Sequence, residues 1–179
     1  MRRLLLAAAT ATFALVTTPA AAAGGTLDPV LDPAADRIAT ADLVAAAKWG
    51  TGKPIEDPAR ERQVLDRVSR RAAELGVDPD VAVRVLRDQI EASKLVQRAW
   101  HGHWAAHPDQ RPERRPDLGE VRPEIDRATE AILLGLRATA EVRTGPSCPS
   151  ALAASYHRTA EDLIPLHRLG LARASTSLC

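Results

Sequence analysis

Aromatic side chains, cysteines and familiar active-site motifs are scarce or missing in this chain of 179 residues. Aromatic residues make up 3% of the sequence, and only two cysteines occur. The chain has no GxGxxG, Walker-type loop or GxSxG motif, so it lacks the usual signatures of dinucleotide-binding proteins, P-loop proteins and serine hydrolases. Alternation of apolar and polar residues typical of strands is also absent, whereas helical periodicity is widespread. The sequence therefore predicts an all-α protein.

The cysteines and histidines are poorly placed to bind a metal ion. Cys148 and Cys179 are more than thirty residues apart and form no CxxC pair. In an exported chain such an even pair predicts a disulfide, which would tie the C-terminus to the start of the last helix. His103 and His107 have a metal-compatible i,i+4 spacing, but no cluster of further ligands accompanies them. We therefore predict no metal site.

The N-terminus has the three parts of a secretory signal peptide. Arg2 and Arg3 precede the apolar run "LLLAAATATFALVTT", and "PAAAAGG" then offers small residues for cleavage near Ala23. A retained membrane anchor is the alternative, but the run is short, contains threonines and ends in alanines rather than charges. We expect a signal peptide over residues 1–23 and a secreted or periplasmic domain over residues 24–179.

Neither sign of charge dominates. The chain has 24 Lys and Arg against 23 Asp and Glu, and residues 1–23 contain two of the arginines and no acid. The mature chain therefore has 22 basic and 23 acidic residues, a net charge of −1. Such a balance, without a basic tail, gives no reason to expect nucleic acid as a partner. No membrane association is expected after cleavage.

Asp-Pro pairs mark several helix starts, because Asp caps a helix and Pro is tolerated in its first turn. Five helices are expected, over roughly residues 28–49, 58–76, 79–104, 118–143 and 150–174, the last kinked at Pro165. The polar, Pro-rich stretch "HPDQRPERRPD" is expected to be a loop. The prediction is a single-domain bundle of about five helices, a fold that often builds ligand sites between facing helices.

Charged and polar side chains fall on helix faces that are otherwise apolar. Three stripes have helical spacing: Arg37, Ala41, Val44 and Lys48; Asp57, Arg60, Glu61 and Val64; and Leu86, Ile90, Ser93 and Gln97. Buried cations need an anionic partner, and hydroxyl and amide groups suit a small polar ligand. The stripes predict a pocket for a small dianion. In the alternative interpretation the cations reach past the core into water, Asp57 is only a helix cap, and the other charges are solvated.

Two segments, "PIEDPARERQVLDRV" and "LGVDPDVAVRVLRDQIEASKLVQRA", resemble the helical, AroQ-type chorismate mutases. The signal peptide, the "AAAKW" helix end, the "PDL" before the fourth helix and the two cysteines make the chain similar to the secreted gamma subclass. The resemblance implies an isomerase of aromatic amino acid biosynthesis that converts chorismate, a small dianion, to prephenate. This concerted [3,3] rearrangement needs no cofactor or metal, so catalysis is positioning plus electrostatics. The resemblance also suggests a homodimer.

The resemblance further implies which residues bind the two substrate carboxylates. Arg37, Arg60 and Arg122 would hold them, because the planar guanidinium donates two parallel hydrogen bonds to a carboxylate. Ser93 would add another hydrogen bond. Cytosolic members supply one arginine across a dimer interface, and Arg122 would replace it within this chain.

The remaining roles concern the ring hydroxyl and the ether oxygen of the substrate. Asp57 and Glu61 would orient the hydroxyl, Asp57 in part through its backbone. Lys48 and Gln97 would donate hydrogen bonds to the ether oxygen, which gains negative charge as the C–O bond breaks. Because these two would bind the transition state better than the ground state, they are the expected catalytic residues.

Two other functions compete with this interpretation. One is an isochorismate pyruvate lyase of the same fold, which an assay with both substrates would separate from a mutase. The other is a non-catalytic exported helical protein that binds a partner. The complete set of charged and polar residues argues against the second, because a binding surface has no need to keep that set inside a bundle.

Overall fold

The computed structural model describes residues 25–179, which form helices and no strands. The elements are α1 (Asp28–Lys48), α2 (Pro58–Glu74), α3 (Pro79–Ala106), η1 (Pro108–Gln110), α4 (Leu118–Ala138), α5 (Ala140–Thr144), α6 (Cys148–Ala160) and α7 (Pro165–Ala174). The all-α prediction is confirmed, although α-helices number seven over this range rather than about five. The signal peptide predicted over residues 1–23 lies outside the described residues. Among the helices described, none has an apolar stretch long enough to cross a membrane.

The Asp-Pro pairs act as helix starts through specific cap hydrogen bonds. Asp57 Oδ1 accepts from the backbone N–H of Arg60 at 3.0 Å, and Asp78 Oδ1 accepts from that of Asp80 at 2.8 Å. The prolines that follow are the first residues of α2 and α3. Just beyond the end of α2, Gly76 has a φ of 71°, the left-handed conformation that glycine adopts without strain.

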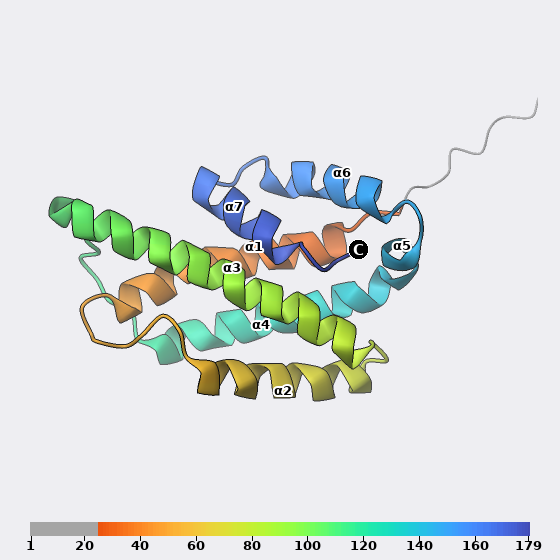
Figure 1. The fold of residues 1–179 in the computed structure, drawn as a ribbon, viewed down its shortest axis with the longest axis horizontal. Helices are drawn as coiled ribbons and strands as arrows, with labels where there is room; N and C mark the ends of the chain where they lie inside the picture. The colour runs from red at the N-terminus through yellow and green to blue at the C-terminus, as the bar shows by residue number, and fades with distance from the viewer. Residues whose placement is uncertain (1–24) are drawn as a thin grey trace, which may run out of the picture.

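The predicted last helix over residues 150–174 is wrong as a single element, because the chain forms the separate helices α6 and α7. Pro165 has no N–H to continue a helix, and it disfavours helical backbone at Ile164, whose ψ is 155°. Arg168 closes the turn by donating to the carbonyls of Leu163 and Glu161 at 2.8 and 2.9 Å. The two helices fold back on one another (Figure 1).

Two smaller predictions also need correction. The predicted fourth helix ends at Ala138 instead of continuing to residue 143, and Thr139 Oγ1 donates to the carbonyl oxygen of Gly135 at 2.8 Å where it ends. Such a bond from a threonine side chain competes with the helical backbone pattern. The Pro-rich loop after α3 contains the short turn η1, which begins at Pro108.

Helix α1 is the centre of the bundle and contacts α3, α4, α6 and α7 (Figure 1). Its contact with α4 is close at Gly135, where a Cβ atom would clash with the carbonyl oxygen of Pro29. That carbonyl has no helical partner, because the residue four positions on is Pro33. Helix α2 packs on α3, so that its inner face turns toward the same region as α1 and α4.

The predicted disulfide is confirmed. Cys148, the first residue of α6, is bonded to Cys179, the last residue of the chain. Cys148 is buried at 2% exposure beside Leu178, so the bond fixes the C-terminal segment against the core. Neither cysteine lines the cavity described below.

Candidate active site

Side chains of α1, α2, α3 and α4 enclose a cavity of about 310 Å³, a size typical of small-molecule sites. All eight predicted ligand-binding residues line it: Arg37, Lys48, Asp57, Arg60, Glu61, Ser93, Gln97 and Arg122. Of the three predicted stripes, Ala41 and Leu86 do not reach the cavity and are fully buried in the core. Residues from four helices, distant in sequence, therefore meet at one place.

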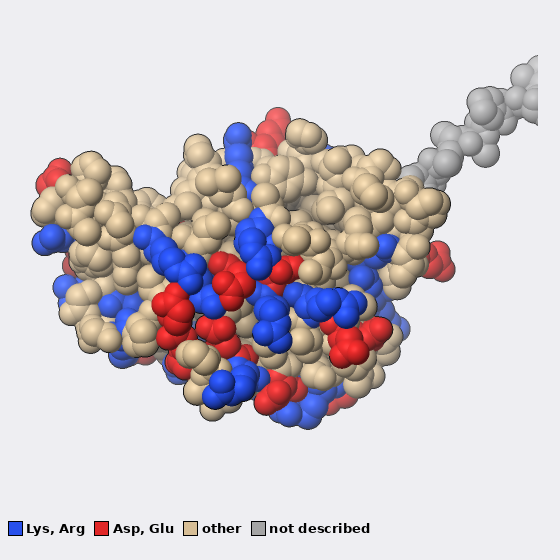
Figure 2. Space-filling view, viewed as in Figure 1, with Lys and Arg blue, Asp and Glu red and all other residues tan. Residues whose placement is uncertain are grey.

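The cavity carries more positive than negative charge. Its basic residues are Arg37, Lys48, Arg60, Arg67, Arg71, Lys94 and Arg122, and its acidic residues are Asp57, Glu61, Asp126 and Glu130. Apolar side chains such as Val44, Ile90 and Leu133 complete the lining. On the outer face of the bundle, acidic and basic side chains lie intermixed over α2 and the middle of α3 (Figure 2). Seven cations against four acids make the cavity suited to a small anion with an apolar part.

Arg37 is the most deeply buried cation of the site, with 6% of its surface exposed. Its Nε donates to Thr129 Oγ1 at 3.3 Å, and its Nη1 donates to the carbonyl oxygen of Gln89 at 3.2 Å. Burial lowers the pKa of Arg37 to about 10, against the opposing effect of Asp126. The side chain thus stays charged at neutral pH, and two of its five N–H donors are used, which leaves three for a ligand.

Lys48 closes one end of the cavity at the last turn of α1. Its Nζ donates to the carbonyl oxygen of Ile55 at 3.1 Å, in the segment that joins α1 to α2. Burial lowers the pKa of Lys48, and the nearby carboxylates of Asp57, Glu56 and Glu61 act in the opposite direction. Because an ammonium group has three donors, two remain for a ligand after the bond to Ile55.

Gln97 has a buried amide that is only half satisfied. It is 3% exposed, its Nε2 lies 3.0 Å from Ser93 Oγ, and its Oε1 has no hydrogen-bond partner. A half-turn of the amide exchanges its two terminal atoms without changing its shape, and it lets the Ser93 hydroxyl donate to Oε1. In that orientation Nε2 becomes the free atom. An unpaired buried polar atom costs about 1–3 kcal/mol, so a ligand that pairs with it gains that amount.

The residues at the start of α2 cap the helix and also line the cavity. Asp57 is the helix cap expected from the sequence, and its own N–H donates to Glu61 Oε1 at 3.4 Å. Arg60 is half-buried, with only a long contact of 3.5 Å between its Nη1 and Gln63 Oε1. Arg122, in the second turn of α4, is exposed at the rim of the cavity. Both guanidinium groups thus have donors available.

Sequence reasoning missed several cavity residues, and Lys94 is the most buried charged residue among them. Lys94 is 8% exposed and pairs with Glu61 and Glu91. Helical spacing could have identified Lys94 as a cavity residue. It follows Ile90 by four positions and precedes Gln97 by three, so it lies on the same face of α3. Arg71 and Glu130 were also missed, and they form an ion pair of 2.6 Å between α2 and α4.

The histidines weighed as metal ligands lie elsewhere. The rings of His103 and His107 stack at 4.5 Å, and His103 Nε2 lies 2.8 Å from Gln110 Oε1. Within residues 25–179, no group of three or more His, Cys, Asp or Glu side chains is placed to hold a metal ion. Neither histidine lines the cavity.

Comparison with known proteins agrees with the geometry of the site. The family described as chorismate mutase type II matches residues 30–98, a range that contains seven of the eight predicted residues. The secreted chorismate mutase of Mycolicibacterium smegmatis is 35% identical over 98% of this chain and 99% of its own length. That of Mycobacterium tuberculosis is 32% identical, over 90% of this chain and 83% of its own length.

Solved structures agree with the sequence relatives. The crystal structure of chorismate mutase from Burkholderia thailandensis superposes with a TM-score of 0.81 at 37% identity, over 86% of this chain and 98% of that one. The enzyme from Burkholderia phymatum also gives a TM-score of 0.81, at 34% identity over 87% and 99% of the two chains. With sequence, fold and cavity in agreement, this chain belongs to the family of secreted, AroQ-type chorismate mutases, which are isomerases.

Proposed function

We propose that this protein converts chorismate to prephenate in the cavity between α1, α2, α3 and α4. The observation that carries the proposal is the cavity lining, in which four helices contribute donors to one space with excess positive charge. Chorismate has two carboxylates, so it matches that charge. In the rearrangement the ether C–O bond breaks while a new C–C bond forms, and no proton is transferred.

Arginines bind the two carboxylates in this proposal. Arg37 supplies a buried, fixed guanidinium with three free donors, while Arg60 and Arg122 approach from the rim. Binding a dianion against three arginines holds the substrate folded, with the two reacting carbons near each other. Holding the substrate in this near-attack conformation places the reacting atoms in the geometry that bond formation needs.

Lys48 and Gln97 act on the ether oxygen. Lys48 has two free N–H donors, and Gln97 has free N–H donors on Nε2 when its amide is turned so that Oε1 accepts from the Ser93 hydroxyl. As the C–O bond breaks, negative charge grows on that oxygen, and both donors bind it more strongly than in the ground state. Ser93 holds the Gln97 amide in place through the contact of 3.0 Å.

The ring hydroxyl is oriented by Glu61, with Asp57 assisting at the start of α2. Glu61 lines the cavity and is held from two sides, by the Asp57 N–H and by Lys94. We further propose that the mature domain comprises residues 24–179, is exported after cleavage near Ala23, and forms a homodimer with independent sites. The names of its two mycobacterial relatives support export.

The test is a turnover assay on the purified mature protein, with chorismate and isochorismate supplied separately. A mutase consumes chorismate and forms a product of unchanged mass, because isomerisation neither adds nor removes atoms. A lyase would instead split isochorismate and release pyruvate. Well-folded protein that leaves chorismate intact contradicts the proposal and favours a non-catalytic binding protein.

A further inference from the structure

We propose that Lys94 is a positioning residue, which holds the carboxylate of Glu61 in place to accept a hydrogen bond from the substrate hydroxyl. The inference rests on the proposed function, since it concerns that same site. It starts from a buried cation on the cavity wall that contacts no substrate atom in the chemistry described above.

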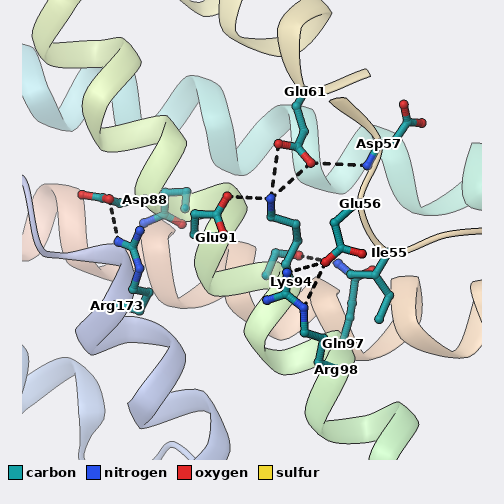
Figure 3. Close-up of polar contacts among 12 residues, drawn as sticks. Ile55, Glu56, Asp57, Glu61, Asp88, Glu91, Lys94, Gln97, Arg98 and Arg173 are labelled. Carbon is teal, nitrogen blue, oxygen red and sulfur yellow. Dashed lines mark hydrogen bonds and ion pairs between the residues drawn. The ribbon is translucent and has the colours of Figure 1, made fainter. Parts of the chain in front are cut away.

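The ammonium group of Lys94 lies between two carboxylates from different helices (Figure 3). Its Nζ is 3.3 Å from both Oε1 and Oε2 of Glu61 on α2, and 2.5 Å from Glu91 Oε1 on α3. The Lys94 side chain is 10% exposed, whereas those of Glu61 and Glu91 are 26% and 35% exposed. The most shielded group is therefore the cation, and it fixes the more accessible acids around it.

The Lys94 ammonium group is directed at protein carboxylates rather than at the cavity. An ammonium group carries three N–H donors, and three carboxylate oxygens lie within reach of Nζ. Lys48 differs, because its only hydrogen bond goes to the carbonyl oxygen of Ile55. Lys48 can therefore contact a ligand directly, whereas Lys94 acts on the ligand through Glu61.

Glu61 keeps one acceptor position free. An ionised carboxylate offers about four lone-pair positions. Lys94 occupies two of them, and the N–H of Asp57 occupies a third. The remaining position suits a single O–H donor. Because all three existing partners belong to the protein, the direction of that position is set before the substrate binds.

The charge of Lys94 is permanent at physiological pH. Burial alone would lower the pKa of Lys94, but its hydrogen bonds with Glu91 and Glu61 outweigh that effect and raise it. Glu91 does not line the cavity, and it lies three residues before Lys94 on α3. Glu91 therefore binds the Lys94 ammonium group away from the cavity, whereas Glu61 binds it at the cavity wall.

A double-mutant cycle with Lys94→Met and Glu61→Ala tests the inference. A misplaced hydroxyl contact is expected to reduce kcat/KM of Lys94→Met by about 10- to 100-fold. In the Glu61→Ala background, Lys94→Met should change kcat/KM by less than about twofold, because Lys94 acts only through Glu61. Lys94→Gln replaces Lys94→Met if the latter fails to fold. Arg87→Met, at an exposed position of α3 outside the cavity, is the matched control and should retain wild-type kcat/KM.

Two outcomes of the cycle overturn the inference. One is wild-type kcat/KM in Lys94→Met. The other is an equal loss in both backgrounds, which indicates direct substrate contact or a general structural role. A crystal structure of Lys94→Met supplies a readout without turnover, and it should show Glu61 turned out of the cavity; an unmoved Glu61 also overturns the inference. If the wild-type protein has no mutase activity, that result contradicts the proposed function alone. The crystal structure of Lys94→Met still tests the role of Lys94, because the position of Glu61 is measured without turnover.

Discussion

Replacing Gln97 by Glu tests the proposed chemistry where it is most sensitive to pH. An amide donates a hydrogen bond at every ordinary pH, whereas a carboxyl group donates only when it is protonated. The wild-type kcat/KM is therefore expected to be nearly constant from mildly acidic to mildly alkaline pH. In Gln97→Glu the ionised carboxylate would repel the ether oxygen as its negative charge grows, so activity is expected only at acidic pH.

The size of the effect follows from the surroundings of Gln97. Loss of one donor to a developing oxyanion costs about 10²- to 10³-fold in rate, or about 2.7–4 kcal/mol. The site is 3% exposed, and such burial raises the pKa of an introduced carboxyl above its ordinary value of about 4.3. The cation of Lys48 acts in the opposite direction. Above that pKa, kcat/KM should fall about tenfold per pH unit until the loss of the donor is complete.

The assay measures kcat/KM from about pH 4 to 8 for the wild type, Gln97→Glu and Gln97→Leu. Leucine has a similar size and no donor, so Gln97→Leu should be about 10²- to 10³-fold slower at every pH. It separates the loss of a donor from the gain of a charge. A flat Gln97→Glu profile at the wild-type level would refute the contact between Gln97 and the ether oxygen, and with it the proposed catalytic role.

Three further predictions concern binding, the disulfide and acid stability. Arg60→Ala should lose about 10- to 150-fold in kcat/KM, the equivalent of about 1.5–3 kcal/mol for a charge-assisted hydrogen bond; Arg62→Ala, exposed on α2 and outside the cavity, should match wild type in the same assay. Reducing the bond between Cys148 and Cys179, separated by 31 residues, should destabilise the fold by about 3–4 kcal/mol and lower Tm, whereas activity at 25 °C should persist because neither residue lines the cavity. Hydrogen bonds from an arginine of α6 lower the pKa of Asp28 from 3.8 to about 2. The ionised Asp28 therefore stabilises the fold above about pH 4, and this contribution is lost as the pH falls toward 2. Urea denaturation should therefore show Asp28→Asn less stable than wild type by up to about 1 kcal/mol at pH 5 and equal to it near pH 2; an equal deficit at both pH values would contradict that linkage.

The sequence predicted the helix starts correctly where the signal involves only neighbouring residues. Asp57 with Pro58 and Asp78 with Pro79 start α2 and α3 as expected, because a cap hydrogen bond involves only neighbouring residues. The prediction of a single helix over residues 150–174 was wrong because its outcome depends on distant contacts. Pro165 ends a regular helix, but whether the chain then bends slightly or reverses depends on what α7 packs against, and it packs on α1 and α3.

The site was predictable in part because helical spacing fixes which side chains share a face. Arg37 and Lys48 on α1, and Ser93 and Gln97 on α3, were found from that spacing alone. The partner of each charge was not predictable in the same way. Glu61 and Lys94 are 33 residues apart, and only the packing of α2 on α3 brings them within 3.3 Å.

By itself, the sequence determined the all-α class, the helix starts, the disulfide cysteines and the set of polar residues on each inner face. These features depend on backbone geometry and residue chemistry within one or two helical turns. Only the tertiary structure decided that four such faces meet around one cavity, that Gln97 keeps a buried amide atom free, and that Lys94 is enclosed by two carboxylates. These features depend on how the helices pack against one another, and packing is decided by the core as a whole rather than by any single segment.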